Sequence, residues 1–280
     1  MVSNFPTVGV LGSGPLVQLL NSPASSLGIN LLNLEDKTDV ALCSAITLVG
    51  DSVSIAQVKT LEKLGTLVRP NSSAIEFVMS WNERIKKSDG IGFSVLVARS
   101  PHGQASAWTP TGTVQIGSFN YSVTPTPNLS PKQMAFAQKL SLDLAKEAEV
   151  IGVMQAEIIV QDGEISAGVV TLGPTATGVW TIEGSRTSQF EQHLRAILDL
   201  PLGDPSLCGR FTVSAAYKGE RNMYRPYLHL MARSPGLKFH QYPPENAMHA
   251  GHVTALGADL LDLQECVSHA VEYMNGVIDE

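Results

Sequence analysis

The sequence predicts a small α/β domain, then a larger α+β core, and then a small β-rich domain closed by a helix. The apolar run Thr7–Leu11 is followed by a glycine turn, a short helical stretch and a second apolar run, an order typical of an α/β unit. Farther along, Thr, Val and aromatic residues fall in short runs, and Asp162-Gly163 is a strong hairpin signal. The chain ends in an amphipathic stretch, which predicts a helix over about Leu260–Ile278.

The first domain is predicted to span residues 1–80. Its apolar runs predict buried strands, and the apolar spacing between them predicts helices. The charged segment Ser80–Gly90 is the expected boundary to the next domain. The predicted strands are Thr7–Leu11, Gly28–Leu34 and Ile46–Val49, and the predicted helices are Leu16–Leu20 and Ser54–Leu64.

The core is predicted to span residues 81–205, and the C-terminal domain residues 206–280. Phe93–Ala98 is typical of a buried strand, and Ser130-Pro131 combines an N-cap residue with proline at the first helical position. Ala156–Gln161 and Glu164–Leu172 form the predicted hairpin. Thr187 or Ser188 is expected to cap a further helix that ends near Leu198.

Composition excludes several classes of function. The formal net charge is -7 and no block of Lys and Arg stands out, so a nucleic-acid surface is not expected. No apolar run is long enough for a membrane helix or a signal segment. Cys43, Cys208 and Cys266 lie far apart without metal-ligand spacing, which favours free thiols in a reducing compartment. We therefore expect a cytoplasmic protein that binds neither nucleic acid nor membrane.

The turn Gly12-Ser13-Gly14 follows a strand, as the phosphate-binding turn of a nucleotide site does. Val17 occupies the position where a dinucleotide fingerprint needs a third glycine. A plain tight turn and a nucleotide site both remain open.

Glu157 is the candidate metal ligand of the predicted hairpin. A two-residue turn at Asp162-Gly163 puts Glu157 opposite Gly168, with Val169 next along the partner strand. Magnesium needs several oxygen ligands, and one carboxylate holds it poorly. A salt-bridged or solvated strand glutamate is the competing interpretation. His249 and His252 are three residues apart and could bind a metal in a helix, but the neighbouring residues favour a loop that leads into a strand.

The run Trp180–Gly203 (WTIEGSRTSQFEQHLRAILDLPLG) resembles the signature of N5-carboxyaminoimidazole ribonucleotide synthase, the PurK-type ATP-grasp enzyme. Val8–Leu20, Ser94–Arg99, Ile151–Val160 and Phe239–Gly257 are similar to other family segments in the same order. The resemblance implies a reduced ATP-grasp-like architecture with a pre-ATP-grasp domain at its N-terminus. It also implies ancestry in purine biosynthesis and a family that is commonly dimeric.

The chain departs from the family at the expected site. The resemblance puts the first metal-binding glutamate at Glu157 and the second at Val169. Only Arg69–Gly92 fills the space of the family's nucleotide-covering lid. Charged or polar family residues are also replaced at Gly168, Gly173, Thr175, Ala176 and Val179, at Met248-His249-Ala250, and at Pro15 and Gln18. A glycine of the family's first turn is replaced by Val17.

These departures predict a degenerate, non-catalytic relative that acts as a binding, scaffold or regulatory protein, in a homodimer or with a protein partner. The alternative is an active ATP-dependent aminoimidazole ribonucleotide carboxylase that uses magnesium–ATP and a partner subunit for the missing lid. A third hypothesis is a small-molecule sensor. Its pocket would be lined by Gly12, Gly14, Ser188, Gln189 and His252, against which Ser188 and Gln189 could simply begin a helix and His252 could be a core residue.

Overall fold

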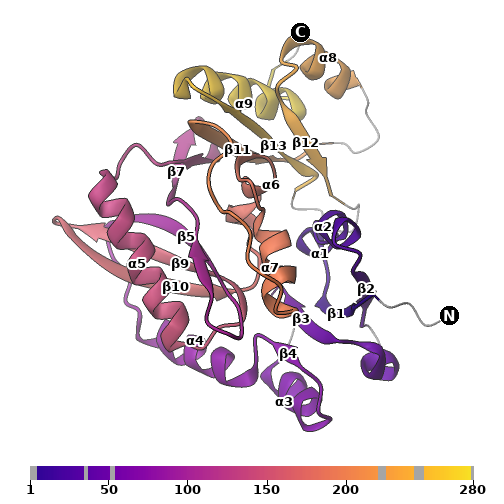
Figure 1. Cartoon of the computed structure of the whole chain (residues 1–280). Coiled ribbons are helices and arrows are strands. Elements are labelled where there is room, and N and C mark those ends of the chain that lie inside the picture. The colour runs from indigo at the N-terminus through magenta and orange to yellow at the C-terminus, as the bar shows by residue number, and fades with distance from the viewer. Residues whose placement is uncertain (1–4, 35–36, 51–53, 220–224, 243–248, 279–280) are drawn as a thin grey trace.

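The computed structural model describes residues 5–34, 37–50, 54–219, 225–242 and 249–278. These residues form a parallel sheet of four strands and an antiparallel sheet of nine, with helices packed on both (Figure 1). The predicted mixed α/β class is confirmed. Among the described residues, no helix has both the length and the apolar character needed to cross a membrane.

The four-stranded sheet has the order β2-β1-β3-β4. Its strands are parallel. After each strand the chain crosses back through a helical segment, so the next strand begins at the same end of the sheet. The predicted helix Leu16–Leu20 is found as α1, which ends earlier because the chain turns at Leu19-Leu20, and a second short helix, α2, follows. The elements are β1 (Thr7–Gly12), α1 (Pro15–Gln18), α2 (Asn21–Ser26), β2 (Asn30–Asn33), η1 (Lys37–Leu42), β3 (Ala45–Val49), α3 (Ile55–Lys63) and β4 (Val68–Arg69).

The helix α4 (Ser72–Arg84) joins the two sheets. Asn71 caps it by accepting a hydrogen bond from the Ala74 N–H. Ser80–Arg84, the first part of the segment expected at the boundary, complete α4. The charged residues there form the outer face of a helix whose inner face is apolar. Only residues 85–90 form an extended connection, which we call the strap.

The nine-stranded sheet has the order β10-β9-β5-β7-β8-β11-β13-β12, and β6 pairs with β5. It crosses residue 205, since Thr212 of β11 pairs with Thr124 of β8. The division into domains at residues 80 and 205 therefore remains a proposal. The strands are β5 (Ile91–Arg99), β6 (Ala105–Ala107), β7 (Thr111–Ile116), β8 (Phe119–Thr124), β9 (Gly152–Gln161), β10 (Glu164–Leu172), β11 (Phe211–Tyr217), β12 (Lys238–Gln241) and β13 (Gly251–Gly257).

Helices cover both faces of this sheet. The helix α5 packs on Val95, Val97 and Met154, and α9 packs on Val213 and Val253 at the other end (Figure 1). The helix α7 lies between the two sheets. Phe190, Leu194 and Ile197 pack into the core of the four-stranded sheet, and α7 also contacts β5 and β9 of the nine-stranded sheet. The helices and turns are α5 (Pro131–Glu147), η2 (Ala176–Gly178), α6 (Thr181–Gly184), α7 (Gln189–Ile197), α8 (Arg225–Arg233) and α9 (Leu260–Met274).

Candidate functional site

The candidate site is centred on Glu157 in β9. Ala156 and Ile158 point into the core beneath α5, so the alternation of a strand puts Glu157 on the opposite face. On one side Glu157 is in register with Ser94 of β5. On its other side β10 contains a bulge. The site therefore lies near the free edge of the nine-stranded sheet.

The bulge corrects the predicted register of the hairpin. Ala167 pairs with Ile158 and Val170 pairs with Ala156, so Gly168 and Val169 together stand opposite Glu157. The predicted placement of Gly168 opposite Glu157 is confirmed, and the bulge adds Val169 to the same position, because the turn length does not reveal an extra residue farther along the strand. Glycine fits here because a Cβ at position 168 would lie 2.6 Å from Glu157 Oε2.

Glu157 is the one carboxylate that the hairpin directs to this position. Its Oε2 accepts a hydrogen bond of 3.3 Å from the Val169 N–H. Val169, which the resemblance aligns with the second metal-binding glutamate, is 44% exposed. It lines a cavity of about 350 Å³ with Leu48 and Met79. Within the described ranges, no three His, Cys, Asp or Glu side chains are grouped to hold a metal. The residues present do not fit a magnesium–ATP complex, which needs several oxygen ligands on its cation.

Side chains of α4 hold the outer edge of the bulge. The Trp81 indole N–H donates to the Gly168 carbonyl at 2.9 Å. Asn82 donates from Nδ2 to the Val170 carbonyl at 2.8 Å and accepts from the Val170 N–H at 2.9 Å. These bonds satisfy backbone groups that an edge strand would otherwise expose. The bulge is thereby fixed in position beside Glu157.

We expect Asn82→Ala to lower the free energy of unfolding by about 2 kcal/mol, because two hydrogen bonds of about 1 kcal/mol each are lost. Hydrogen exchange of the Val170 amide should accelerate by more than the global loss of stability explains. Glu83→Ala, on the exposed side of the same helix, is the matched control and should leave this amide unchanged. Equal exchange in both variants would contradict the role given to Asn82.

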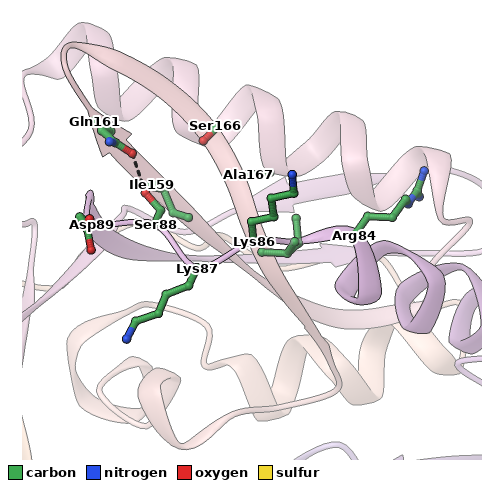
Figure 2. Close-up of a pocket in the computed structure, with 10 residues that line it drawn as sticks. Arg84, Lys86, Lys87, Ser88, Asp89, Ile159, Gln161, Ser166 and Ala167 are labelled. Atoms are coloured by element: carbon green, nitrogen blue, oxygen red, sulfur yellow. Dashed lines mark hydrogen bonds between the residues drawn. The ribbon is translucent and has the colours of Figure 1, made fainter.

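The strap crosses β9 and β10 beside a polar pocket of about 450 Å³. Ser88 Oγ donates to Gln161 Oε1 at 2.7 Å and fastens the strap to the hairpin. Three cations line the pocket, but Lys86 and Lys87 leave the strap on opposite sides, and Arg84 donates to the Ser80 carbonyl of its own helix (Figure 2). The cations do not converge on one point where a phosphate could bind.

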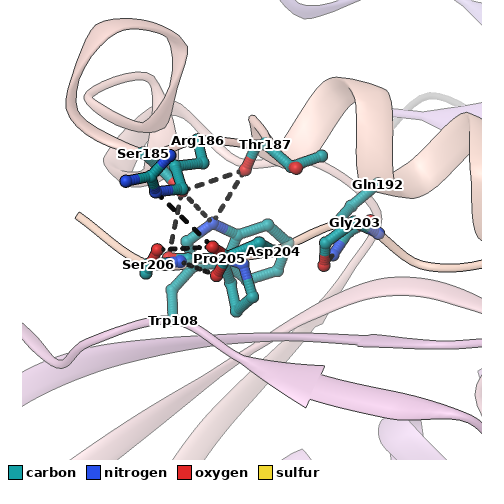
Figure 3. A network of polar contacts seen from close by, with 9 residues as sticks. All are labelled: Trp108, Ser185, Arg186, Thr187, Gln192, Gly203, Asp204, Pro205 and Ser206. Carbon is teal, nitrogen blue, oxygen red and sulfur yellow. Dashed lines mark hydrogen bonds and ion pairs between the residues drawn. The ribbon is translucent and has the colours of Figure 1, made fainter. Parts of the chain in front are cut away.

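Residues of the run Trp180–Gly203 form hydrogen bonds with one another and with Trp108, which follows β6. The Trp108 indole N–H lies 3.1 Å from both Ser185 Oγ and the Thr187 carbonyl (Figure 3). Gln192 donates to the Gly203 carbonyl at 2.8 Å and accepts from its N–H at 2.7 Å. These side chains use their polar groups within the protein. The network holds α7 and the following loop against β5 and β6.

Comparison with known proteins gives this arrangement a family context. The ATP-grasp domain family matches residues 82–190. N5-carboxyaminoimidazole ribonucleotide synthase of Mycobacterium bovis is 38% identical over 191 residues, which are 65% of this chain and 44% of that protein. The synthase of Corynebacterium ammoniagenes is 38% identical over 178 residues, 59% of this chain and 43% of that protein.

The crystal structure of N5-carboxyaminoimidazole ribonucleotide synthetase from Thermus thermophilus has the same fold. It superposes with a TM-score of 0.80 at 18% identity, over 98% of this chain and 99% of the other. The chain is an ATP-grasp relative of N5-carboxyaminoimidazole ribonucleotide synthase. The matched region spans under half the length of the curated synthases.

In this ATP-grasp relative, Gly12 and Gly14 shape the turn after β1. Gly12 has a φ of 135°, and a Cβ on it would lie 1.9 Å from the Val49 carbonyl oxygen. Gly14 has a φ of 97° and precedes the four-residue helix α1. Close approach of two strands accounts for Gly12 without a ligand. The tight-turn interpretation fits both residues, and their binding of a ligand remains a prediction.

Ser188 and Gln189 begin α7, as the helix-cap alternative anticipates. Ser188 Oγ accepts from the Glu191 N–H at 3.2 Å. Gln189 is fully buried. It accepts from the Thr175 N–H at 3.0 Å and donates to the Thr175 carbonyl at 2.7 Å. Both side chains therefore stabilise the ATP-grasp core, and a ligand would have to displace these bonds.

His252 is a fully buried residue of β13. Its Nδ1 lies 2.7 Å from the Tyr242 hydroxyl, and its ring stacks on His240 with centroids 4.7 Å apart. His240 in turn lies 3.1 Å from Glu183 Oε1. Desolvation, with a smaller effect of His240, lowers the pKa of His252 to about 3. His249 precedes the strand in a loop, not in a helix that would pair it with His252.

Sequence reasoning missed the contacts that join the two sheets. His193 of α7 is fully buried, with Nε2 at 2.6 Å from Thr47 Oγ1 of β3 and Nδ1 accepting from the Val153 N–H at 3.0 Å. Arg69 Nη1 donates to the Ile197 carbonyl at 2.6 Å. No local motif marks these partners. Thr47 and His193, and likewise Arg69 and Ile197, are more than 100 residues apart in the sequence.

Proposed function

We propose that this chain is a catalytically inactive relative of the purine-biosynthesis carboxylases that acts by binding, as a scaffold or regulatory protein. Val169 carries the proposal. The resemblance aligns it with the second metal-binding glutamate, and its backbone N–H donates a hydrogen bond to Glu157 Oε2. Transfer of phosphate from ATP depends on metal ions that neutralise the developing charge, and one carboxylate of this kind does not hold them.

The environment of the bulge supports the same conclusion. Trp81 and Asn82 fix the backbone of Gly168 and Val170, so β10 cannot shift to bring another carboxylate opposite Glu157 without breaking three hydrogen bonds. Meanwhile the run Trp180–Gly203 retains its internal network. A retained scaffold beside an altered metal site is what a protein selected for binding would show. A homodimer, a protein partner and a cytoplasmic location belong to this proposal.

Magnesium–ATP binding tests the proposal directly. We expect no shift in the midpoint of thermal unfolding at millimolar magnesium–ATP. A ligand present at a hundred times its dissociation constant would stabilise the fold by about 2.7 kcal/mol, which is readily measured. A shift that Glu157→Gln removes would overturn the proposal and favour the alternative, an active carboxylase that depends on a partner subunit.

A second test of the proposal introduces a carboxylate at position 169. Val169→Glu adds the missing oxygen ligands at a side chain that is already 44% exposed. We expect this variant to gain a magnesium-dependent stabilisation that the natural chain lacks. Val169→Gln has the same shape without the charge and should gain none. A magnesium response already present in the natural chain and unchanged in Val169→Glu would contradict the assignment of position 169.

A further inference from the structure

A separate cavity lies at the end of the nine-stranded sheet that α8 and α9 cover. It has a volume of about 780 Å³, within the roughly 300–1,000 Å³ of small-molecule sites. It is formed where β8 begins and where β11 and α9 end. None of its lining residues lines either pocket beside Glu157. The cavity is therefore independent of the candidate site and of the function proposed for it.

The wall of the cavity is mainly apolar. Phe119 and Tyr273 contribute aromatic surface, and Met274 and Ile278 contribute aliphatic surface. Phe119, Tyr273 and Met274 are also part of the core cluster beneath α9, so their side chains are held by packing. A wall of this kind favours the apolar body of a ligand because contact removes apolar surface from water.

The described lining also includes two cations, Lys218 and Arg225, and no acidic residue is part of it. Both side chains are exposed, and the described part of the chain gives neither an ion-pair partner. Lys218 follows β11 and Arg225 begins α8, so the two cations stand on separate elements that both border the cavity. Two cations that have no ion-pair partner among the described residues, beside an apolar wall, complement a ligand with one anionic end.

The end of α9 determines how such a ligand would be oriented. The carboxyl end of a helix carries partial negative charge and repels an anion. Asn275 closes this end by accepting from the Lys218 N–H at 2.6 Å and donating to the Val271 carbonyl at 2.7 Å. The anionic group is therefore expected at Lys218 and Arg225, and the apolar body against the last turn of α9.

We propose that this cavity binds an amphipathic monoanion, an acyl or aryl carboxylate or sulfonate whose apolar body contacts Phe119, Tyr273 and Met274 and whose anionic group pairs with Lys218 and Arg225. The ligand class follows from the combination of wall and cations. Either feature alone would fit a wider range of molecules.

The test uses two fluorescent probes of similar shape, the anionic 8-anilinonaphthalene-1-sulfonate and the uncharged N-phenyl-1-naphthylamine. We expect the natural protein to bind the anionic probe at one site. Lys218→Gln combined with Arg225→Gln should weaken it about tenfold, as the loss of two charge-assisted contacts implies, and should change binding of the uncharged probe by less than about twofold. Lys238→Gln, a cation of β12 outside the cavity, should affect neither probe.

A third variant keeps the outcome interpretable. Val277 is 59% exposed at the cavity, so Val277→Glu adds a negative charge without disturbing the core and should also weaken the anionic probe. All variants alter exposed side chains, and unchanged thermal midpoints will show that they fold. Binding of the anionic probe that none of these changes reduces, or the lack of binding in the natural protein, would overturn the proposal. Neither result bears on magnesium–ATP binding.

Discussion

Acidification from pH 6.5 to pH 4 should lower the free energy of unfolding steeply, with His193 responsible for about 3 kcal/mol of the loss. His193 is fully buried and hydrogen-bonded in its neutral form, and desolvation lowers its pKa to about 4 from an ordinary value of 6.5. In the unfolded chain the imidazole takes up a proton near pH 6.5, but in the folded protein it does so only near pH 4. Between these values the unfolded state binds more protons, so stability falls as the pH falls.

The position of His193 makes this effect larger than that of a surface histidine. Its Nε2 bonds Thr47 of the parallel sheet and its Nδ1 bonds Val153 of the antiparallel sheet. Protonation of Nδ1 would turn the acceptor of the Val153 N–H into a second donor. His252, with a pKa of about 3, should add to the slope in the same direction.

Urea unfolding at several pH values, read as free energy against pH, measures the effect. In His193→Gln the slope of the free energy of unfolding against pH, between pH 4 and 6.5, should fall by the amount that corresponds to about one proton. A natural chain whose stability is flat over this range would contradict the assignment.

Truncation of Trp108 should cause the largest loss of stability among single substitutions in the core. Trp108 is fully buried beside Leu96, Val153 and Trp180. Trp108→Ala should lower the free energy of unfolding by about 4 kcal/mol, because it opens a large cavity. It also leaves Thr187 without the indole N–H that its carbonyl accepts. That loss is a large fraction of the roughly 5–15 kcal/mol that stabilises a typical protein.

Trp108→Phe separates packing from hydrogen bonding and guards against a variant that does not fold. It keeps much of the aromatic contact and loses the two indole hydrogen bonds, so we expect a loss of about 2 kcal/mol. Phe136→Ala removes an aromatic ring that is 51% exposed on α5 and should change stability by less than about 1 kcal/mol. Midpoints of urea unfolding measure all three. A Trp108→Ala variant as stable as Phe136→Ala would show that the network around Ser185 and Thr187 contributes little.

Local signals in the sequence were sufficient for most individual elements. Ser130 and Pro131 predict the start of α5, and the structure confirms it and adds Gln133 as the second partner of a capping box. The hairpin at Asp162-Gly163 is also confirmed. Both depend on a few neighbouring residues, and the backbone conformations involved are set within one turn of chain.

The candidate site was predictable only in part. The resemblance aligned Glu157 and Val169 with the two metal-binding glutamates of the family, and the structure does place the two residues together, but through a bulge that also puts Gly168 opposite Glu157. Helix α4 was overlooked because its last turn is charged, although Trp81 and Asn82 of that turn fix the bulge. The role of these two residues depends on β10, which lies almost 90 residues farther along the chain.

The sequence by itself therefore determined the fold class and the family resemblance, because these depend on residue identity and short-range pattern. The alignment of Val169 with a metal-binding glutamate of the family is an expectation from the same resemblance. The tertiary structure alone decided that Glu157 bonds a backbone N–H, that His193 joins the two sheets, and that Lys218 and Arg225 meet at an apolar cavity. Each of these depends on which distant segments pack together. Burial and long-range contact set that outcome, and neither can be read from spacing along the chain.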